Sequence, residues 1–178
     1  GRWMASHAKR LAHEAMLLAL ALICAYLEFL FPLSFGIPGI KLGLANLVIV
    51  YALYADGAGV ALRVSLCRVL LSALLFGNLS MGLYSLAGGM ASLLVMIGLY
   101  RRPYFSLWGV SLAGGAVHNI AQVLLAACIS GTPQILYYLI LLIPVGMFTG
   151  LLIAFLTFGV RRALYPARQT IGKGGSGG

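Results

Sequence analysis

Acidic residues are nearly absent from this sequence, which holds three of them against 12 lysines and arginines. Enzymes of prenyl or phosphoryl transfer hold Mg²⁺ with clustered carboxylates, so the shortage excludes a metal site of that kind. The sequence also lacks a glycine-rich Walker loop for ATP and a serine–histidine–aspartate pattern. We therefore expect a protein that is not an enzyme and binds no metal or cofactor of its own.

Cysteine is scarce as well. Cys24, Cys67 and Cys128 lie singly within hydrophobic runs, so their spacing fits neither a set of metal ligands nor a disulfide framework. Isolated cysteines of this kind are usually small buried residues. His118 has no second histidine or cysteine nearby that could complete a metal site.

Charged residues make up only 8% of the chain, whereas hydrophobic residues make up 62% and the mean hydropathy is +1.03. A soluble domain carries about a quarter charged residues, so this composition predicts an integral membrane protein in contact with a lipid bilayer. The net charge of +9 does not indicate nucleic-acid binding. The basic residues do not form one patch but lie at the ends of hydrophobic runs, as membrane topology requires.

Six hydrophobic runs are expected to cross the membrane as helices. They cover about residues 15–31, 40–55, 60–76, 79–100, 105–129 and 135–160. Pro144 inside the last run is expected to kink its helix. We predict an all-α integral membrane protein with six transmembrane helices, which places both termini on one side.

The basic residues identify that side. With six spans, three basic clusters lie on the side of the termini, and the positive-inside rule makes this side cytoplasmic. The clusters are Arg2 with Lys9 and Arg10, Arg101 with Arg102, and Arg161 with Arg162 and Arg168.

The predicted topology divides the chain into three parts. Residues 1–14 form a cytoplasmic N-terminal segment, residues 15–162 the six-helix membrane domain, and residues 163–178 a cytoplasmic tail. Part of the N-terminal segment is expected to be vector-derived. The GKGGSGG sequence at residues 172–178 has the composition of an appended flexible linker.

Polar side chains within the spans gather in the outer half of the predicted bundle. Lys41 and Asn46 lie in the outer half of the second span, after a Pro/Gly turn, and Glu28 lies near the outer end of the first. Arg68 is past the middle of the third span, and Asn78 is in the outer loop that follows. Because hydrocarbon offers no hydrogen bonds, such groups need a partner or a watery cavity.

On the fifth span, His118, Asn119 and Gln122 form a polar stripe at helical spacing. The planar guanidinium donors of Arg68 suit a phosphate or carboxylate. We predict a small-molecule site built from these groups and Tyr84. Structural roles remain open: snorkelling for Lys41, pairing with Glu28 for Arg68, an interfacial aromatic belt for Tyr84, and interhelical hydrogen bonds for the stripe. The predicted substrate-binding residues are Glu28, Lys41, Asn46, Arg68, Asn78, Tyr84, His118, Asn119 and Gln122.

Small residues form a second pattern on the first span. Ala15 and Ala19, and likewise Ala21 and Ala25, are spaced four residues apart and so share a helix face. Such a face serves either packing within the bundle or docking of another membrane subunit. The sequence Ser-Leu-Ala-Gly-Gly occurs at residues 85–89 and 111–115, and we interpret both copies as packing sites.

Several of these motifs together resemble the Gx transporter family, which is also labelled heptaprenyl diphosphate synthase component I. The family is similar to the substrate-binding S-components of energy-coupling factor (ECF) transporters. The resemblance covers about residues 15–160. It is carried by FGIPGIKLGLAN at residues 35–46, Arg68 with Phe76-Gly77, YSLAGG at 84–89, SLLVM at 92–96 and GGAVHNIAQ at 114–122.

The resemblance implies a six-helix S-component fold that binds a vitamin-like molecule near the outer face. The basic lining of the predicted site favours an anionic or carbonyl-rich substrate, such as a flavin or a prenyl or quinone precursor. The resemblance also implies a bacterial plasma membrane location, a membrane coupling subunit and two cytoplasmic ATPases that use the ATP. In S-components an Ala-x-x-x-Ala face on the first helix contacts the coupling subunit, and Ala15 with Ala19, in the inner half, fit this role better. Two alternatives remain: a non-catalytic accessory subunit of an isoprenoid or quinone enzyme, and a stand-alone facilitator.

Overall fold

The computed structural model describes residues 2–31, 43–75 and 79–164, and this part of the chain contains helices and no strand. Two predicted site residues, Lys41 and Asn78, lie outside the described residues. The elements are α1 (Arg2–Leu30), α2 (Asn46–Ala55), α3 (Ala58–Leu75), α4 (Leu79–Tyr100), α5 (Leu107–Ser130), the 3₁₀ helix η1 (Pro133–Tyr138) and α6 (Leu139–Leu164).

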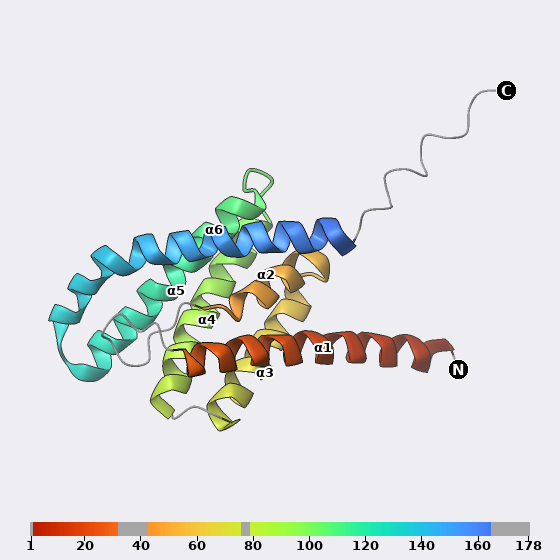
Figure 1. Cartoon of the computed structure of the whole chain (residues 1–178), viewed down its shortest axis with the longest axis horizontal. Helices are drawn as coiled ribbons and strands as arrows, with labels where there is room; N and C mark the ends of the chain where they lie inside the picture. The colour runs from red at the N-terminus through yellow and green to blue at the C-terminus, as the bar shows by residue number, and fades with distance from the viewer. Residues whose placement is uncertain (1, 32–42, 76–78, 165–178) are drawn as a thin grey trace.

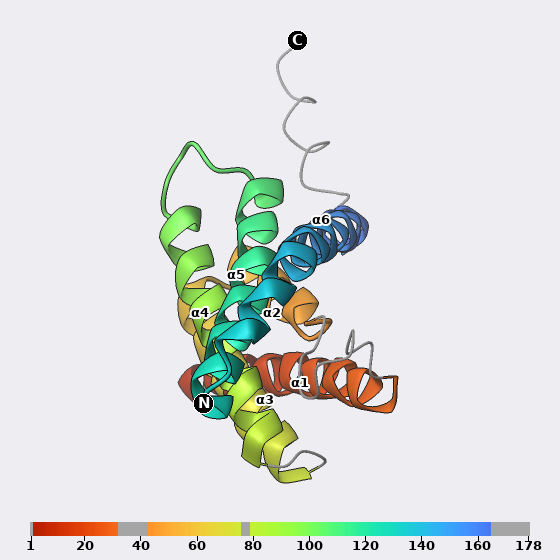
Figure 2. The same cartoon turned by 90° about the vertical axis from the view of Figure 1, so that its left-hand side faces the viewer.

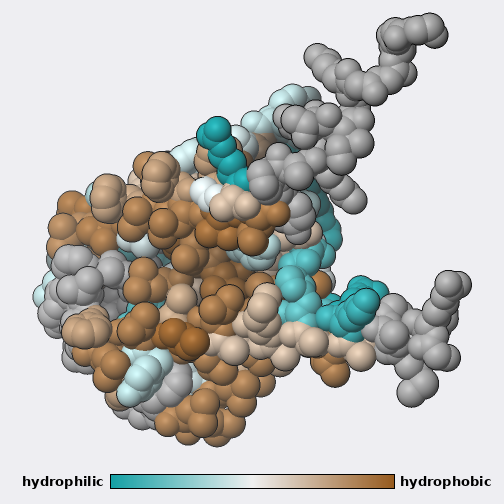
Figure 3. All heavy atoms as spheres, turned by 45° about the vertical axis from the view of Figure 1, so that its right-hand side comes forward, coloured by the Kyte–Doolittle hydropathy of each residue, from teal (hydrophilic) through white to brown (hydrophobic). Residues whose placement is uncertain are grey.

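Five helical segments are long and apolar enough to cross a membrane, and α2 is a shorter apolar helix. Large apolar side chains stay exposed along them, such as Leu74 at 81% and Phe148 at 70%. Figure 3 shows hydrophobic surface over most of the visible face, with hydrophilic atoms where α1 leads to the N-terminus and in a separate group at the top. The protein is therefore a multi-pass membrane protein, as predicted, and its described residues form an all-α bundle of six α-helices and the short η1.

Helix α2 begins later than the second predicted span. Its 10 residues, Asn46–Ala55, cover about 15 Å, half of the roughly 30 Å hydrocarbon core. Gly43 has a φ of 84°, a left-handed conformation that cannot continue a right-handed helix. The predicted run of residues 40–55 is therefore wrong as one continuous helix, because a glycine turn precedes its last 10 residues.

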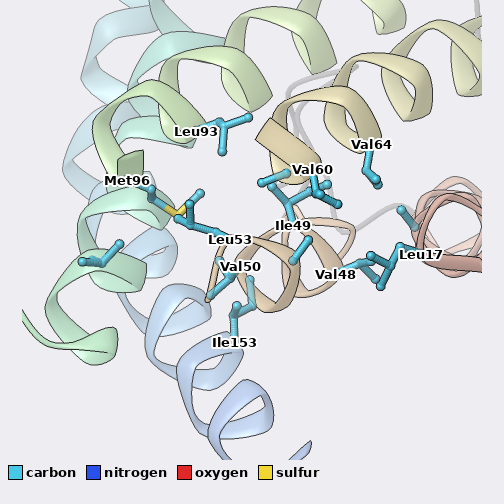
Figure 4. Close-up of a cluster of buried hydrophobic side chains, with 14 residues drawn as sticks. Leu17, Val48, Ile49, Val50, Leu53, Val60, Val64, Leu93, Met96 and Ile153 are labelled. Carbon is cyan, nitrogen blue, oxygen red and sulfur yellow. The ribbon is translucent and has the colours of Figure 1, made fainter. Parts of the chain in front are cut away.

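Helix α2 is the centre of the bundle. Its sequence is apolar on every side, as expected for a helix without a solvent or lipid face, and six of its 10 residues are buried. In both Figure 1 and Figure 2, α2 lies between α1 below and α6 above. Figure 4 shows its Ile49, Val50 and Leu53 among side chains from α3, α4 and α6. Because Asn46 is the first residue of α2, the position of this helix determines where that polar side chain lies.

Helices α5 and α6 pack with their backbones in contact. A Cβ atom built on Gly115 would lie 2.0 Å from the carbonyl oxygen of Gly146, and one on Gly150 would lie 2.3 Å from that of Ser111. The Ser111 hydroxyl also donates to the Gly150 carbonyl at 2.7 Å. The second Ser-Leu-Ala-Gly-Gly motif lies at this contact, where only glycine allows such an approach.

Helix α1 lies at the side of the bundle, and polar contacts tie its N-terminal half to α2 and α3. Arg63 on α3 donates to both carboxylate oxygens of Glu14, at 2.9 and 2.6 Å. His13 pairs with Asp56, at the end of α2, at 3.0 Å. The helix starts well before the hydrophobic run at residue 15. The start of α1 and the end of α6 point to the same side in Figure 1.

Candidate functional site

Five polar side chains, each less than a tenth exposed, lie inside the bundle and are connected through three glycines. We call them the polar cluster: Glu28 from α1, Asn46 from α2, Arg68 from α3, and His118 and Gln122 from α5. All five were predicted site residues, although they are separated by up to 94 positions in the sequence (122 − 28). Polar groups buried this deeply need hydrogen-bond or ligand partners.

The turn before α2 joins α1 to this cluster. The backbone N–H of Gly43 donates to Oε1 of Glu28 at 2.5 Å, so the carboxylate stabilises the left-handed turn. A Cβ atom on Gly43 would lie 3.2 Å from Nδ2 of Asn46 and 3.3 Å from Nε2 of His118. The bare glycine backbone therefore lies directly against both side chains.

Asn46 and His118 are neighbours, with 3.4 Å between Nδ2 of the amide and Nδ1 of the ring. The amide nitrogen can only donate, and Nδ1 accepts this bond when it carries no proton of its own. At this distance the bond is weak. The contact nevertheless fixes which face of α5 meets the start of α2.

Two glycines of α4 receive the side chains from α3 and α5. A Cβ atom on Gly88 would lie 2.8 Å from Cγ of Gln122 and 3.0 Å from Cε1 of His118. A Cβ atom on Gly89 would lie 3.0 Å from Nη2 of Arg68. The first Ser-Leu-Ala-Gly-Gly motif, which we interpreted as a packing site, thus packs against polar cluster residues.

Arg68 is 5% exposed. Within the described part of the chain, neither its Nε nor its Nη2 atom has a hydrogen-bond partner. The Glu28 carboxylate interacts electrostatically with its guanidinium group, and the Cys24 side chain lies near enough to do the same. The charge of Arg68 therefore has a carboxylate near it, whereas two of its donor groups have no partner in the described part of the chain.

Other predicted site residues lie apart from the polar cluster. The amide of Asn119 donates to the Leu142 carbonyl on α6 at 2.7 Å, which is the interhelical role that the sequence left open. Tyr84 is partly exposed on α4, one turn before Gly88. No group of three histidine, cysteine or acidic residues suited to a metal ion occurs among the described residues.

The two small-residue pairs of α1 lie on different faces. Ala21 and Ala25 are 0% and 2% exposed and pack inside the bundle. Ala15 and Ala19 are exposed, together with Met16. Ala21 and Ala25 therefore serve packing within the bundle, whereas Ala15 and Ala19 leave an exposed face of small residues.

Three glycines at the site, Gly43, Gly88 and Gly89, were not predicted as site residues. The sequence does draw attention to Gly88 and Gly89, because two adjacent glycines are unusual within a predicted span. Nothing in the sequence distinguishes such a pair from the one at residues 114 and 115, which packs helices. The role of Gly43 depends on Glu28, 15 residues earlier, and has no local signal.

What the cluster can do chemically follows from its groups. It offers one guanidinium, one imidazole and two carboxamides in a buried interior, where donors bind oxygen atoms of a ligand strongly. The fold and this site define a helical, multi-pass membrane protein with a polar cluster enclosed by its bundle.

A family model described as heptaprenyl diphosphate synthase component I matches residues 17–159. The chain belongs to this family, which confirms the resemblance carried by the sequence motifs. The match runs from α1 to the last turns of α6 and includes every residue of the polar cluster. Searches of curated proteins and of solved structures found no match.

Proposed function

We propose that this protein is the substrate-binding subunit of an ECF-type importer in the bacterial plasma membrane. The observation that supports it is the polar cluster, in which side chains from four helices converge inside the bundle. Ionisable groups buried within a membrane are costly, and they commonly mark substrate or ion pathways. The proposed substrate is a small anionic or vitamin-like molecule, such as a flavin or a prenyl or quinone precursor.

The proposed partners are a membrane coupling subunit and two cytoplasmic ATPases, which would use the ATP. The exposed pair Ala15 and Ala19 supports this part of the proposal. Small residues let another helix approach the backbone of α1 closely, and the pair lies in the half of α1 that carries the ion pairs to α2 and α3. The family name, a component I, also describes a protein that acts with other subunits.

We further propose that the chain has no catalytic activity and no cofactor of its own. All three of its carboxylates attach α1: Glu14 to Arg63, Asp56 to His13, and Glu28 to Gly43. A synthase of prenyl diphosphates would need carboxylates to hold Mg²⁺.

The family name favours a second candidate, a non-catalytic accessory subunit of an isoprenoid or quinone biosynthetic enzyme. Copurification from the native membrane in mild detergent separates the two. Recovery of a coupling subunit with two ATPases supports the importer, and recovery of a soluble prenyl synthase supports the accessory role. Flux into liposomes that contain this chain alone would contradict both and indicate a facilitator.

The same preparation tests substrate binding. Small molecules released from the purified protein are identified by mass spectrometry and absorbance. A stoichiometric molecule that rebinds to the emptied protein supports the importer. Failure to retain any small molecule, together with failure to bind any small anion, flavin, quinone precursor or prenyl phosphate, contradicts it.

A further inference from the structure

The donors of Arg68 that lack a partner lie on one edge of its guanidinium group. In a planar guanidinium, the N–H of Nε and one N–H of Nη2 are parallel and point the same way. These two nitrogens are the buried ones without a hydrogen-bond partner among the described residues. A pair of parallel donors of this kind matches an acceptor group with two oxygens in one plane.

The unused edge is not explained by a structural role for Arg68. The Glu28 carboxylate acts on its charge electrostatically, but among the described residues two buried N–H groups of Arg68 have no acceptor, which destabilises a protein. Where only packing is required, an apolar side chain of similar volume serves as well or better than a buried ion. The arrangement therefore suits a residue whose acceptors arrive with a ligand.

Charge distinguishes between the two groups that an arginine edge binds, carboxylates and phosphates. Among its described residues the polar cluster holds one cation, Arg68, and one anion, Glu28, which is 8% exposed. A ligand that enters here brings its negative charge close to the buried Glu28 carboxylate. Because like charges repel strongly in a medium of low dielectric constant, a single negative charge is favoured over the two of a phosphate monoester.

We propose that the polar cluster recognises a carboxylate of its substrate, held by the Nε and Nη2 donors of Arg68. This inference rests on the proposed function and specifies the substrate class of the same site. Gly89 is a positioning residue for this contact, because its missing side chain leaves room for Nη2. His118, Gln122 and Asn46 then contact the neutral oxygen and nitrogen atoms of the ligand.

The inference is tested with three probes that share a ring and differ only in the polar group: benzoate, benzamide and phenyl phosphate. Binding to the full chain in detergent is measured by calorimetry and by the shift in unfolding temperature, at constant ionic strength. We expect saturable binding of benzoate, with benzamide and phenyl phosphate at least about tenfold weaker. Equal binding of benzamide, tighter binding of phenyl phosphate or absence of benzoate binding overturns the inference.

Arg68→Lys is the decisive variant, because lysine keeps the charge beside Glu28 but lacks the two parallel donors. We expect benzoate affinity to fall about tenfold or more while the unfolding temperature of the empty protein changes little. Arg63→Lys, the same change five residues earlier on α3, is the control and should leave benzoate affinity unchanged. Equal affinity in Arg68→Lys and the wild type overturns the inference.

The outcomes separate this inference from the proposed function. A copurifying ligand that is neutral or a phosphate contradicts the carboxylate but leaves the importer intact. Arg68-dependent binding of carboxylates by a chain that copurifies only with a prenyl synthase supports the carboxylate site and contradicts the importer.

Discussion

At the scale of the residue, the geometry of the candidate site depends on three glycines. Gly43 provides a turn that other residues rarely adopt, and Gly88 and Gly89 let polar side chains lie against the backbone of α4. None of these residues can bind a ligand through a side chain. They determine where the side chains that can do so are held.

Gly88→Ala tests this role. The added Cβ atom would lie 2.8 Å from Cγ of Gln122 and must displace it together with His118. We expect a loss of about 1–3 kcal/mol in the free energy of unfolding, typical of overpacking, and weaker binding of the copurified ligand. Denaturant unfolding in detergent micelles and calorimetry measure the two effects.

Gly98→Ala on the same helix is the matched control, because a Cβ atom there meets nothing within 4 Å. Alanine in a helix should leave the protein unchanged or stabilise it by about 0.5–1 kcal/mol. If Gly88→Ala behaves like Gly98→Ala, the close contact between α4 and α5 does not matter for the site.

At the scale of the element, the sequence predicts where the helices lie along the chain but not which helices pack against each other. The hydrophobic runs predicted α4 at its observed bounds and α3, α5 and α6 to within a few residues. They did not predict that His118 faces α4 while Asn119 faces α6. Consecutive residues differ by about 100° around a helix, so hydropathy identifies a span but not the neighbour of each face when all neighbours are apolar.

Five of the nine predicted binding residues lie in the polar cluster for a simple physical reason. A polar group in a membrane span must face the protein interior, so Glu28, Asn46, Arg68, His118 and Gln122 could be chosen by residue type and depth. The turn at Gly43 could not, since it depends on the distant Glu28.

The contact between α5 and α6 predicts a large difference between two glycines of α6. In Gly150→Ala the new Cβ atom would lie 2.3 Å from the Ser111 carbonyl oxygen, so the helices must move apart. We expect destabilisation of about 1–3 kcal/mol or more, measured by denaturant unfolding. Gly159→Ala, where nothing lies within 4 Å, is the control; a similar loss in both variants would contradict the close packing.

The two faces of α1 predict opposite results for leucine substitutions. Ala15→Leu with Ala19→Leu should leave stability and ligand binding unchanged, because both positions are exposed, but should prevent association with the proposed coupling subunit. Ala21→Leu should instead destabilise the isolated protein by about 1–3 kcal/mol, since residue 21 is 0% exposed. Coexpression with the transporter subunits and thermal unfolding are the measurements. Unimpaired association of the double variant would rule out that face as the docking site.

At the scale of the whole molecule, the orientation in the membrane stays a prediction. The start of α1 and the end of α6 point to one side of the bundle, and the cluster of Arg101 and Arg102 was predicted to share that side. The positive-inside rule makes it cytoplasmic.

Cysteine labelling of intact cells checks this orientation. In a background without native cysteines, Tyr104→Cys, between α4 and α5 and 91% exposed, should react only with a membrane-permeant reagent. Thr132→Cys, between α5 and η1, should also react with an impermeant one. The reverse pattern would invert the topology and place the proposed substrate entrance in the cytoplasm.

The attachment of α1 by carboxylates also bears on how the proposed import would be powered. A carrier driven by the proton-motive force relies on a membrane-embedded acid that gains and loses a proton in each cycle. Here each of the three carboxylates contacts a basic side chain or a backbone N–H group. Loss of any of these contacts would loosen α1 from its neighbours, so the three carboxylates serve to hold this helix in place.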